Sequence, residues 1–143
     1  MSFTYEYPRP ALTADCIILH KLGKSFELLL IKRKHEPFEN HWALPGGFMD
    51  MDETIENAAS RELLEETGLI IENLKQFKTY SSINRDPRGR TVSVIFYGFV
   101  DENQLPKAGD DATEVKWFNI NDLPKLAFDH ETIINEFKLE VLK

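Results

Sequence analysis

Apolar and β-branched residues fall into runs along the chain that are typical of β-strands. Five such runs predict strands, at residues 11–20, 26–32, 74–83, 91–100 and 114–119. Residues 21–25 (Lys-Leu-Gly-Lys-Ser) separate the first two runs and favour a hairpin turn. Asp86-Pro87-Arg88-Gly89 lies between the next two, with Pro and Gly where a type I turn prefers them. The pattern predicts two strand pairs and one further short strand.

Two other segments have helical character. The first runs from about residue 54 to 67 and is followed by Gly68, a natural C-terminal stop. The second starts after Asp129, a residue that favours the N-cap position. Its apolar residues recur at helical spacing and predict a packing face, at Ile133, Ile134, Phe137 and Val141. Strand pairs interleaved with two helices predict the α/β (α+β) class, with a mixed sheet covered by helices.

The composition is that of an ordinary globular domain. A length of 143 residues, with 42% hydrophobic and 29% charged residues and no internal repeat, predicts one domain over residues 1–143. The formal net charge of −7 argues against a broad surface for nucleic acid or for an anionic membrane, and we expect neither as a partner. A phosphate-binding function would therefore need a local site, helped by a metal ion.

The cysteine content and the N-terminal sequence indicate a compartment. Cys16 is the single cysteine and lies in an apolar run, which predicts a small core residue in a reducing environment. The chain has no apolar stretch of about 18 residues, and residues 1–6 lack the pattern of a secretory signal. The sequence therefore predicts a cytoplasmic protein.

The predicted helix over 54–67 carries an unusual group of carboxylates. At about 100° per residue, Glu66 lies at about +40° and Glu65 at about −60° from Glu62, so the three share one patch. The first half of the helix fills the same side with apolar residues, Ile55, Ala58 and Ala59. Glu62 and Glu66 repel each other at i,i+4 unless a cation lies between them. Mg²⁺ or Mn²⁺ would relieve that repulsion, because both prefer carboxylate oxygen.

A simpler interpretation of this helix stays open. A solvated acidic face with one ion pair between Arg61 and Glu65 would contribute about a few tenths of a kcal/mol. Upstream, Gly46-Gly47 permits backbone shapes closed to other residues, and could bring a carbonyl or an amide close to a ligand.

The segment from Gly47 to Leu69 resembles a known family motif. The positions that carry the resemblance are Gly47, Glu53, Arg61-Glu62-Leu63, Glu65-Glu66 and Gly68-Leu69, which match the Nudix box without deviation. The preceding Trp42-Ala43-Leu44-Pro45-Gly46 and the predicted strand order are also similar to this family. The resemblance implies an α/β/α sandwich with a mixed β-sheet. It also implies hydrolysis of a nucleoside diphosphate linked to another moiety.

The resemblance further implies roles for the matched residues. Mg²⁺, with Mn²⁺ as a substitute, would be held by three carboxylates and a backbone group, namely Glu62, Glu65, Glu66 and Gly46. Glu53 would be an auxiliary ligand or a support, and Arg61 would orient a box carboxylate through an ion pair. The resemblance does not fix the general base. It is either a box carboxylate, such as Glu65 or Glu66, or a carboxylate of a later loop. That loop offers Asp110, Asp111 and Glu114, and Asp111 is the candidate we retain.

Substrate choice must depend on residues outside the box. Arginines Arg85, Arg88 and Arg90 lie close together in an acidic chain, and guanidinium groups suit phosphate. Arg33 is a further candidate for binding substrate. The alternative is a solvated turn that merely balances charge. The aromatic side chain that would stack on a base is unassigned among Phe3, Tyr5, Tyr80 and Phe128.

Residues 85–94, 108–112 and 126–130 narrow the resemblance to the ADP-ribose pyrophosphatase branch of the family. That branch implies cleavage of ADP-ribose to AMP and ribose 5-phosphate, a small nucleotide substrate, and a homodimer. Two alternatives stay open. One is a MutT-type (d)NTP pyrophosphohydrolase, and the other is a non-catalytic ADP-ribose sensor.

Overall fold

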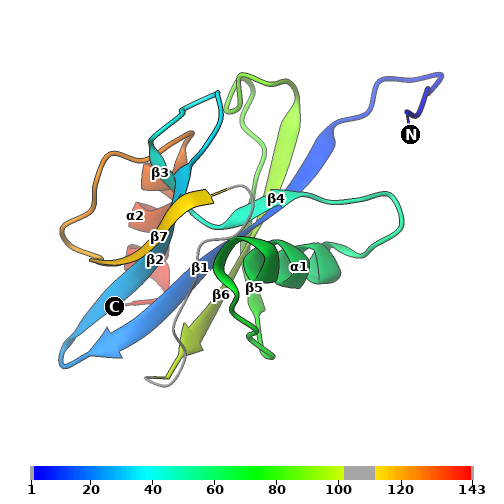
Figure 1. Cartoon of the computed structure of the whole chain (residues 1–143). Coiled ribbons are helices and arrows are strands. Elements are labelled where there is room, and N and C mark those ends of the chain that lie inside the picture. The colour runs from blue at the N-terminus through cyan, green and yellow to red at the C-terminus, as the bar shows by residue number, and fades with distance from the viewer. Residues whose placement is uncertain (1, 102–111, 143) are drawn as a thin grey trace.

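The computed structural model describes residues 2–101 and 112–142, and its elements follow the predicted alternation closely (Figure 1). In chain order they are β1 (Ala11–Leu22), β2 (Ser25–Arg33), β3 (Trp42–Ala43), β4 (Gly46–Phe48), α1 (Ile55–Thr67), β5 (Lys75–Tyr80), β6 (Thr91–Val100), β7 (Ala112–Asn119) and α2 (His130–Glu140). The five predicted strands and both predicted helices are present. The sequence missed β3 and β4, which are only two and three residues long.

All the strands belong to one mixed sheet with β1 at its centre. β1 runs parallel to β6, in a register that sets Ala11 opposite Thr91, and antiparallel to β2. The predicted hairpin is confirmed, since Leu22 pairs with Ser25 across the turn. Beyond Leu28, β2 leaves β1 and pairs with β3, while the other edge of β2 pairs with β7 from Glu27 to Arg33. Where β2 has left, β4 pairs with β1 instead, so Gly46 lies opposite Asp15 at the point where the sheet divides.

The two helices cover opposite faces of this sheet. Alternate residues of β1 separate into two buried clusters because successive side chains of a strand point to opposite faces. One cluster joins β1 to α1 and includes Ala14, Cys16, Ile18, Ala58, Ala59 and Leu63. The other joins β1 to α2 and includes Ile17, Leu19, Ile133, Ile134 and Phe137. The expected α/β/α arrangement is therefore confirmed, and Cys16 is fully buried as predicted. Within the described residues, neither helix is long and apolar enough to cross a membrane.

The helix ends show one prediction confirmed and two corrected. Thr54 caps α1 by accepting a hydrogen bond from the Asn57 N–H, and Gly68 ends it with a left-handed φ of 76°. Asp129 holds the N-cap position of α2, but its carboxylate makes no capping bond there. That carboxylate binds a distant arginine described below. Val141 is not part of the packing face, because it follows the last helical turn and is 36% exposed.

Candidate active site

The two glycines of β4 lie between carboxylates from two elements. A Cβ on Gly46 would lie 2.1 Å from Asp15 Oδ1 and 2.4 Å from the carbonyl oxygen of Ala14. A Cβ on Gly47 would lie 2.5 Å from Cδ of Glu62 on α1. Non-bonded atoms do not approach so closely. At Gly46 the obstacle includes the backbone of β1, so only glycine lets the strand pair there. At Gly47 a Cβ would displace the Glu62 carboxylate.

α1 places two of its three predicted carboxylates against β4. Glu66 is 4% exposed, and its Oε1 accepts the N–H of Gly46 at 2.7 Å. Glu62 is also largely shielded, with 14% of its side chain exposed. Glu65 differs, because half of its side chain is exposed and it does not line the cleft described below. The helical projection thus groups Glu62, Glu65 and Glu66, but the fold brings only Glu62 and Glu66 to the surface beside β4.

Arg61 connects the carboxylates of this region. Its guanidinium contacts Glu53 Oε1 at 2.6 Å, Glu62 Oε1 at 2.9 Å and Glu65 Oε2 at 3.1 Å. It also donates to the carbonyl oxygen of Phe48 on β4 at 3.0 Å. The hydrogen bond from Arg61 is the largest cause that lowers the pKa of Glu53 to about 2. The i,i+4 pair expected between Arg61 and Glu65 is present, but it is one contact of a larger network.

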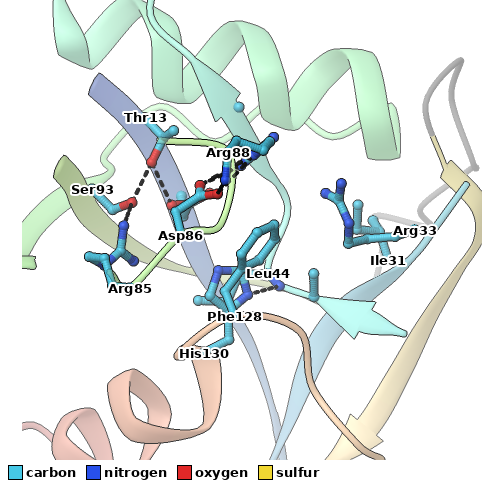
Figure 2. Close-up of a pocket in the computed structure, with 14 residues that line it drawn as sticks. Thr13, Ile31, Arg33, Leu44, Arg85, Asp86, Arg88, Ser93, Phe128 and His130 are labelled. Carbon is cyan, nitrogen blue, oxygen red and sulfur yellow. Dashed lines mark hydrogen bonds and ion pairs between the residues drawn. The ribbon is translucent and has the colours of Figure 1, made fainter. Parts of the chain in front are cut away.

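A cleft of about 400 Å³ is lined by these carboxylates and by two arginines. Glu62, Glu66 and the glycines of β4 share it with Arg33 and Arg88. The ring of Phe128 lies between the two arginines, whose Cζ atoms are 4.9 Å and 5.0 Å from its centroid (Figure 2). Burial, and then repulsion from Arg88, lowers the pKa of Arg33. The cleft therefore combines carboxylate and guanidinium groups in its lining.

The three predicted arginines of this loop differ in exposure and in their partners. Arg88 has 35% of its side chain exposed, and its Nη2 binds Oδ2 of the buried Asp86 carboxylate at 2.8 Å. Arg85 has only 4% of its side chain exposed, and its Nε and Nη2 bind the carboxylate of Asp129 at 2.9 Å and 2.7 Å. It also donates to Ser93 Oγ at 2.7 Å (Figure 2). Arg90 is exposed and contacts the Ser82 carbonyl oxygen at 3.5 Å. The structure thus places three neighbouring arginines in three different environments.

The donor set near Gly46 fits one kind of metal ion. Within residues 2–101 and 112–142, no three His, Cys, Asp or Glu side chains form a group that could hold a metal by themselves. Mg²⁺, however, usually binds through one or two carboxylates and completes its shell with water and substrate phosphate oxygens. Glu62 and Glu66 offer that smaller set in one cleft. These residues fit a hard ion that binds together with a phosphate substrate, and do not fit a caged ion such as structural zinc.

The remaining sequence candidates lie in several places. Asp110 and Asp111 fall outside the described residues. Glu114 is exposed on β7, with Oε1 3.8 Å from Nζ of Lys32. Among the aromatic candidates Phe3, Tyr5, Tyr80 and Phe128, only Phe128 lines the cavities around the cleft. Phe3 and Tyr5 stack on each other in the N-terminal segment that leaves the sheet (Figure 1). The Tyr80 hydroxyl donates to Glu136 at 2.6 Å.

Sequence reasoning missed two residues near the cleft. Asp15 is 7% exposed, although it lies on the central strand. A lone carboxylate inside the apolar run 11–20 was the available signal. Phe38 packs 4.9 Å from Phe128, centroid to centroid, and both residues have left-handed backbones, with φ of 61° and 52°. Such angles are uncommon for bulky residues, and nothing in the local sequence indicates them.

Two buried ionisable groups, which line a small cavity next to the cleft, have opposite pKa shifts. His130 is 4% exposed, and its Nδ1 accepts the N–H of Leu44 at 3.0 Å. Burial is the largest cause that lowers the pKa of His130 from 6.5 to about 4. For Asp15, burial raises the pKa from 3.8 to about 7, against the opposing hydrogen bond from Thr13. At neutral pH the imidazole is therefore uncharged.

These shifts predict opposite effects of acid on the free energy of unfolding. Between pH 6.5 and about 4 the unfolded state protonates His130 and the folded state does not, so stability falls as the pH falls. In the same range the folded state keeps a proton on Asp15 that the unfolded state releases, so stability rises. Each slope is at most about 1.4 kcal/mol per pH unit. The two slopes nearly cancel.

We expect Asp15→Asn to remove one slope and reveal the other. Relative to the wild type, the variant should lose on the order of 3 kcal/mol as the pH falls from about 6.5 to 4. Urea unfolding at several pH values measures this difference. Asp122→Asn, at an exposed position, is the matched control and should give a curve parallel to the wild type. A pH-independent difference for Asp15→Asn would contradict the prediction.

Known proteins are similar to this chain over most of its length. A family model described as the NUDIX domain matches residues 9–137. The chain is 50% identical over 131 residues to a protein named ADP-ribose pyrophosphatase from Methanocaldococcus jannaschii, covering 92% of this chain and 75% of that protein. It is 32% identical over 135 residues to the ADPR responsive transcriptional repressor NtrR of Acinetobacter baylyi, covering 92% of this chain and 54% of the repressor. A solved NUDIX domain of Shewanella oneidensis NrtR complexed with ADP ribose superposes with a TM-score of 0.86 at 30% identity, covering 94% of this chain and 90% of that one.

Proposed function

The chain belongs to the NUDIX domain family, and from this premise we propose that it hydrolyses ADP-ribose to AMP and ribose 5-phosphate. The observation that carries the proposal is the single cleft that Glu62 and Glu66 line together with Arg33 and Arg88. A diphosphate needs cationic groups that hold its oxygens and a site that activates water beside it. The 50% identical ADP-ribose pyrophosphatase supports this choice of substrate.

Nudix hydrolases generally use divalent metals, and we propose Mg²⁺ here, with Mn²⁺ as a substitute. Glu62 and Glu66 would hold the ion, together with the backbone of Gly46. When bound, it would neutralise the diphosphate and lower the pKa of an attacking water. The chain itself prepares the site in two ways. Glu66 fixes β4 through the Gly46 amide, and Arg61 holds Glu62 in place.

We assign the other carboxylates to positioning roles. Glu53 and Glu65 both bind Arg61, and neither lines the cleft. They would act through Arg61 on the orientation of Glu62. Arg33 and Arg88 would hold the diphosphate, because both guanidinium groups line the cleft and guanidinium suits phosphate oxygen.

Arg88→Ala should raise KM for ADP-ribose by about tenfold or more, with a smaller effect on kcat. The reason is that Arg88 lines the cleft, whereas its partner Asp86 keeps a second hydrogen bond from the Arg88 backbone N–H at 2.9 Å. Steady-state kinetics separates the two constants. Arg88→Lys retains the charge without the fork and should recover part of the loss. An unchanged KM would mean that Arg88 does not bind substrate and that this loop only balances charge.

The proposed reaction is tested by offering the purified protein separate substrates with Mg²⁺ and identifying the products chromatographically. ADP-ribose, NADH and 8-oxo-dGTP represent the competing substrate classes. AMP and ribose 5-phosphate in equal amounts, far ahead of other products, would support the proposal. A preference for the triphosphate would favour a MutT-type enzyme. Binding of ADP-ribose without turnover would favour a sensor, the role printed in the name of the Acinetobacter relative.

A further inference from the structure

Two hollows adjoin the cleft, and they differ greatly in size. One is a cavity of about 40 Å³ whose lining includes Thr13, Asp15 and His130 (Figure 2). The other is an open surface of about 550 Å³ between residues 36–38 and 87–88. A water molecule occupies roughly 30 Å³ in the liquid. The smaller hollow therefore has room for about one water. The larger one has room for one of the two groups attached to the diphosphate.

The larger hollow continues directly from the cleft. Glu36 and Arg88 line both of them. A diphosphate held by Arg88 near Glu62 and Glu66 would place one of its two substituents on this surface. The smaller cavity also borders Arg88, but its size excludes a sugar or a base.

The chemistry of the larger hollow suits a flat aromatic ring. Its other lining residues are apolar and rigid, namely Pro37, Phe38 and Pro87. The Phe38 ring is held by Phe128 and by the edge of His41, with centroids 4.9 Å and 5.5 Å away. The guanidinium of Arg88 contacts the Phe48 ring, with Cζ 4.6 Å from the ring centroid. Aromatic side chains and guanidinium planes are the groups on which bases stack in proteins.

We propose that Phe38, together with Pro37, Pro87 and Arg88, forms the subsite for the nucleobase of the substrate. The inference rests on the proposed function, because it takes the diphosphate to lie in the cleft. It replaces the aromatic candidates of the N-terminal segment with a residue that has no signature in the sequence. The sugar phosphate without a base gains nothing from this surface.

The two products of the proposed reaction provide the test. AMP carries the base and ribose 5-phosphate does not, so the ratio of their dissociation constants reports on the base alone. We would measure both constants by calorimetry, with Mg²⁺ present, for the wild type and three variants. Phe38→Leu keeps an apolar side chain and removes the ring, and Phe38→Tyr restores the ring. Phe99→Ala, which removes a ring that is 52% exposed on β6, is the matched control.

Phe38→Leu should weaken AMP binding about tenfold and leave ribose 5-phosphate unchanged. Phe38→Tyr and Phe99→Ala should bind both ligands as the wild type does. An equal loss for both ligands would mean that Phe38 only shapes the cleft, and no loss of AMP binding would place the base elsewhere. Either result overturns the inference. Since the products bind without turnover, a wild type that fails to hydrolyse ADP-ribose would refute the proposed function separately.

Discussion

Replacing Glu66 with Gln is expected to remove most hydrolysis of ADP-ribose while the protein stays folded. Glu66 is buried beside Gly46, and a glutamine keeps both its shape and an oxygen for the Gly46 N–H. What the substitution removes is the negative charge that would hold the metal ion. Metal-assisted charge stabilisation is worth several kcal/mol, so kcat should fall by about a hundredfold or more.

Single-turnover and steady-state rates, together with a thermal melt, test this expectation. Glu56→Gln is the matched control, because Glu56 is exposed in the first turn of the same helix. It should retain the activity and the melting temperature of the wild type. A Glu66→Gln variant with near-normal kcat would rule this carboxylate out as a metal ligand.

The second large effect is expected at Arg85, and it concerns stability rather than substrate binding. Arg85→Ala should lower the free energy of unfolding by about 3–5 kcal/mol, because it leaves the Asp129 carboxylate without its bidentate partner. It also removes the donor to Ser93 Oγ. For a domain of this size the melting temperature should fall by roughly 10 °C or more.

Arg90→Ala provides the comparison within the same loop. Arg90 is exposed, so its loss should change stability by no more than about 0.5 kcal/mol. Urea unfolding of both variants, with KM measured on the folded protein, separates the two roles. If Arg85→Ala instead raised KM with an unchanged melting temperature, Arg85 would belong to the substrate site.

The fold could be predicted well where an element is long enough to show a pattern in the sequence. β1 is a long run of apolar and β-branched residues, and Thr54 and Gly68 mark the ends of α1. β3 and β4 could not be found in this way, because two or three residues show no period. β4 exists through its pairing with β1 and its contact with α1, which are tertiary relations.

The same limit applies to the candidate site. Residues close in the sequence could be grouped, but contacts between distant segments could not be predicted. The helical projection brings Glu62 and Glu66 together because their spacing is local. It could not distinguish Arg85 from Arg88, since the difference is a partner, Asp129, from the start of a distant helix. The same pairing explains why Asp129 does not cap α2. Phe38 was missed for a related reason, because its place at the rim depends on a left-handed backbone and on Phe128.

The parallel pairing of β1 with β6 also constrains how the chain folds during synthesis. Ala11 pairs with Thr91, and the register continues to His20 opposite Val100. The hairpin of β1 and β2 is local and can form early, but the other edge of β1 has no partner until the second half of the chain has left the ribosome. Pairings between distant segments form slowly, and an unpaired apolar edge invites association with other chains. The nascent N-terminal third therefore keeps one apolar edge of β1 unpaired until β6 has been synthesised.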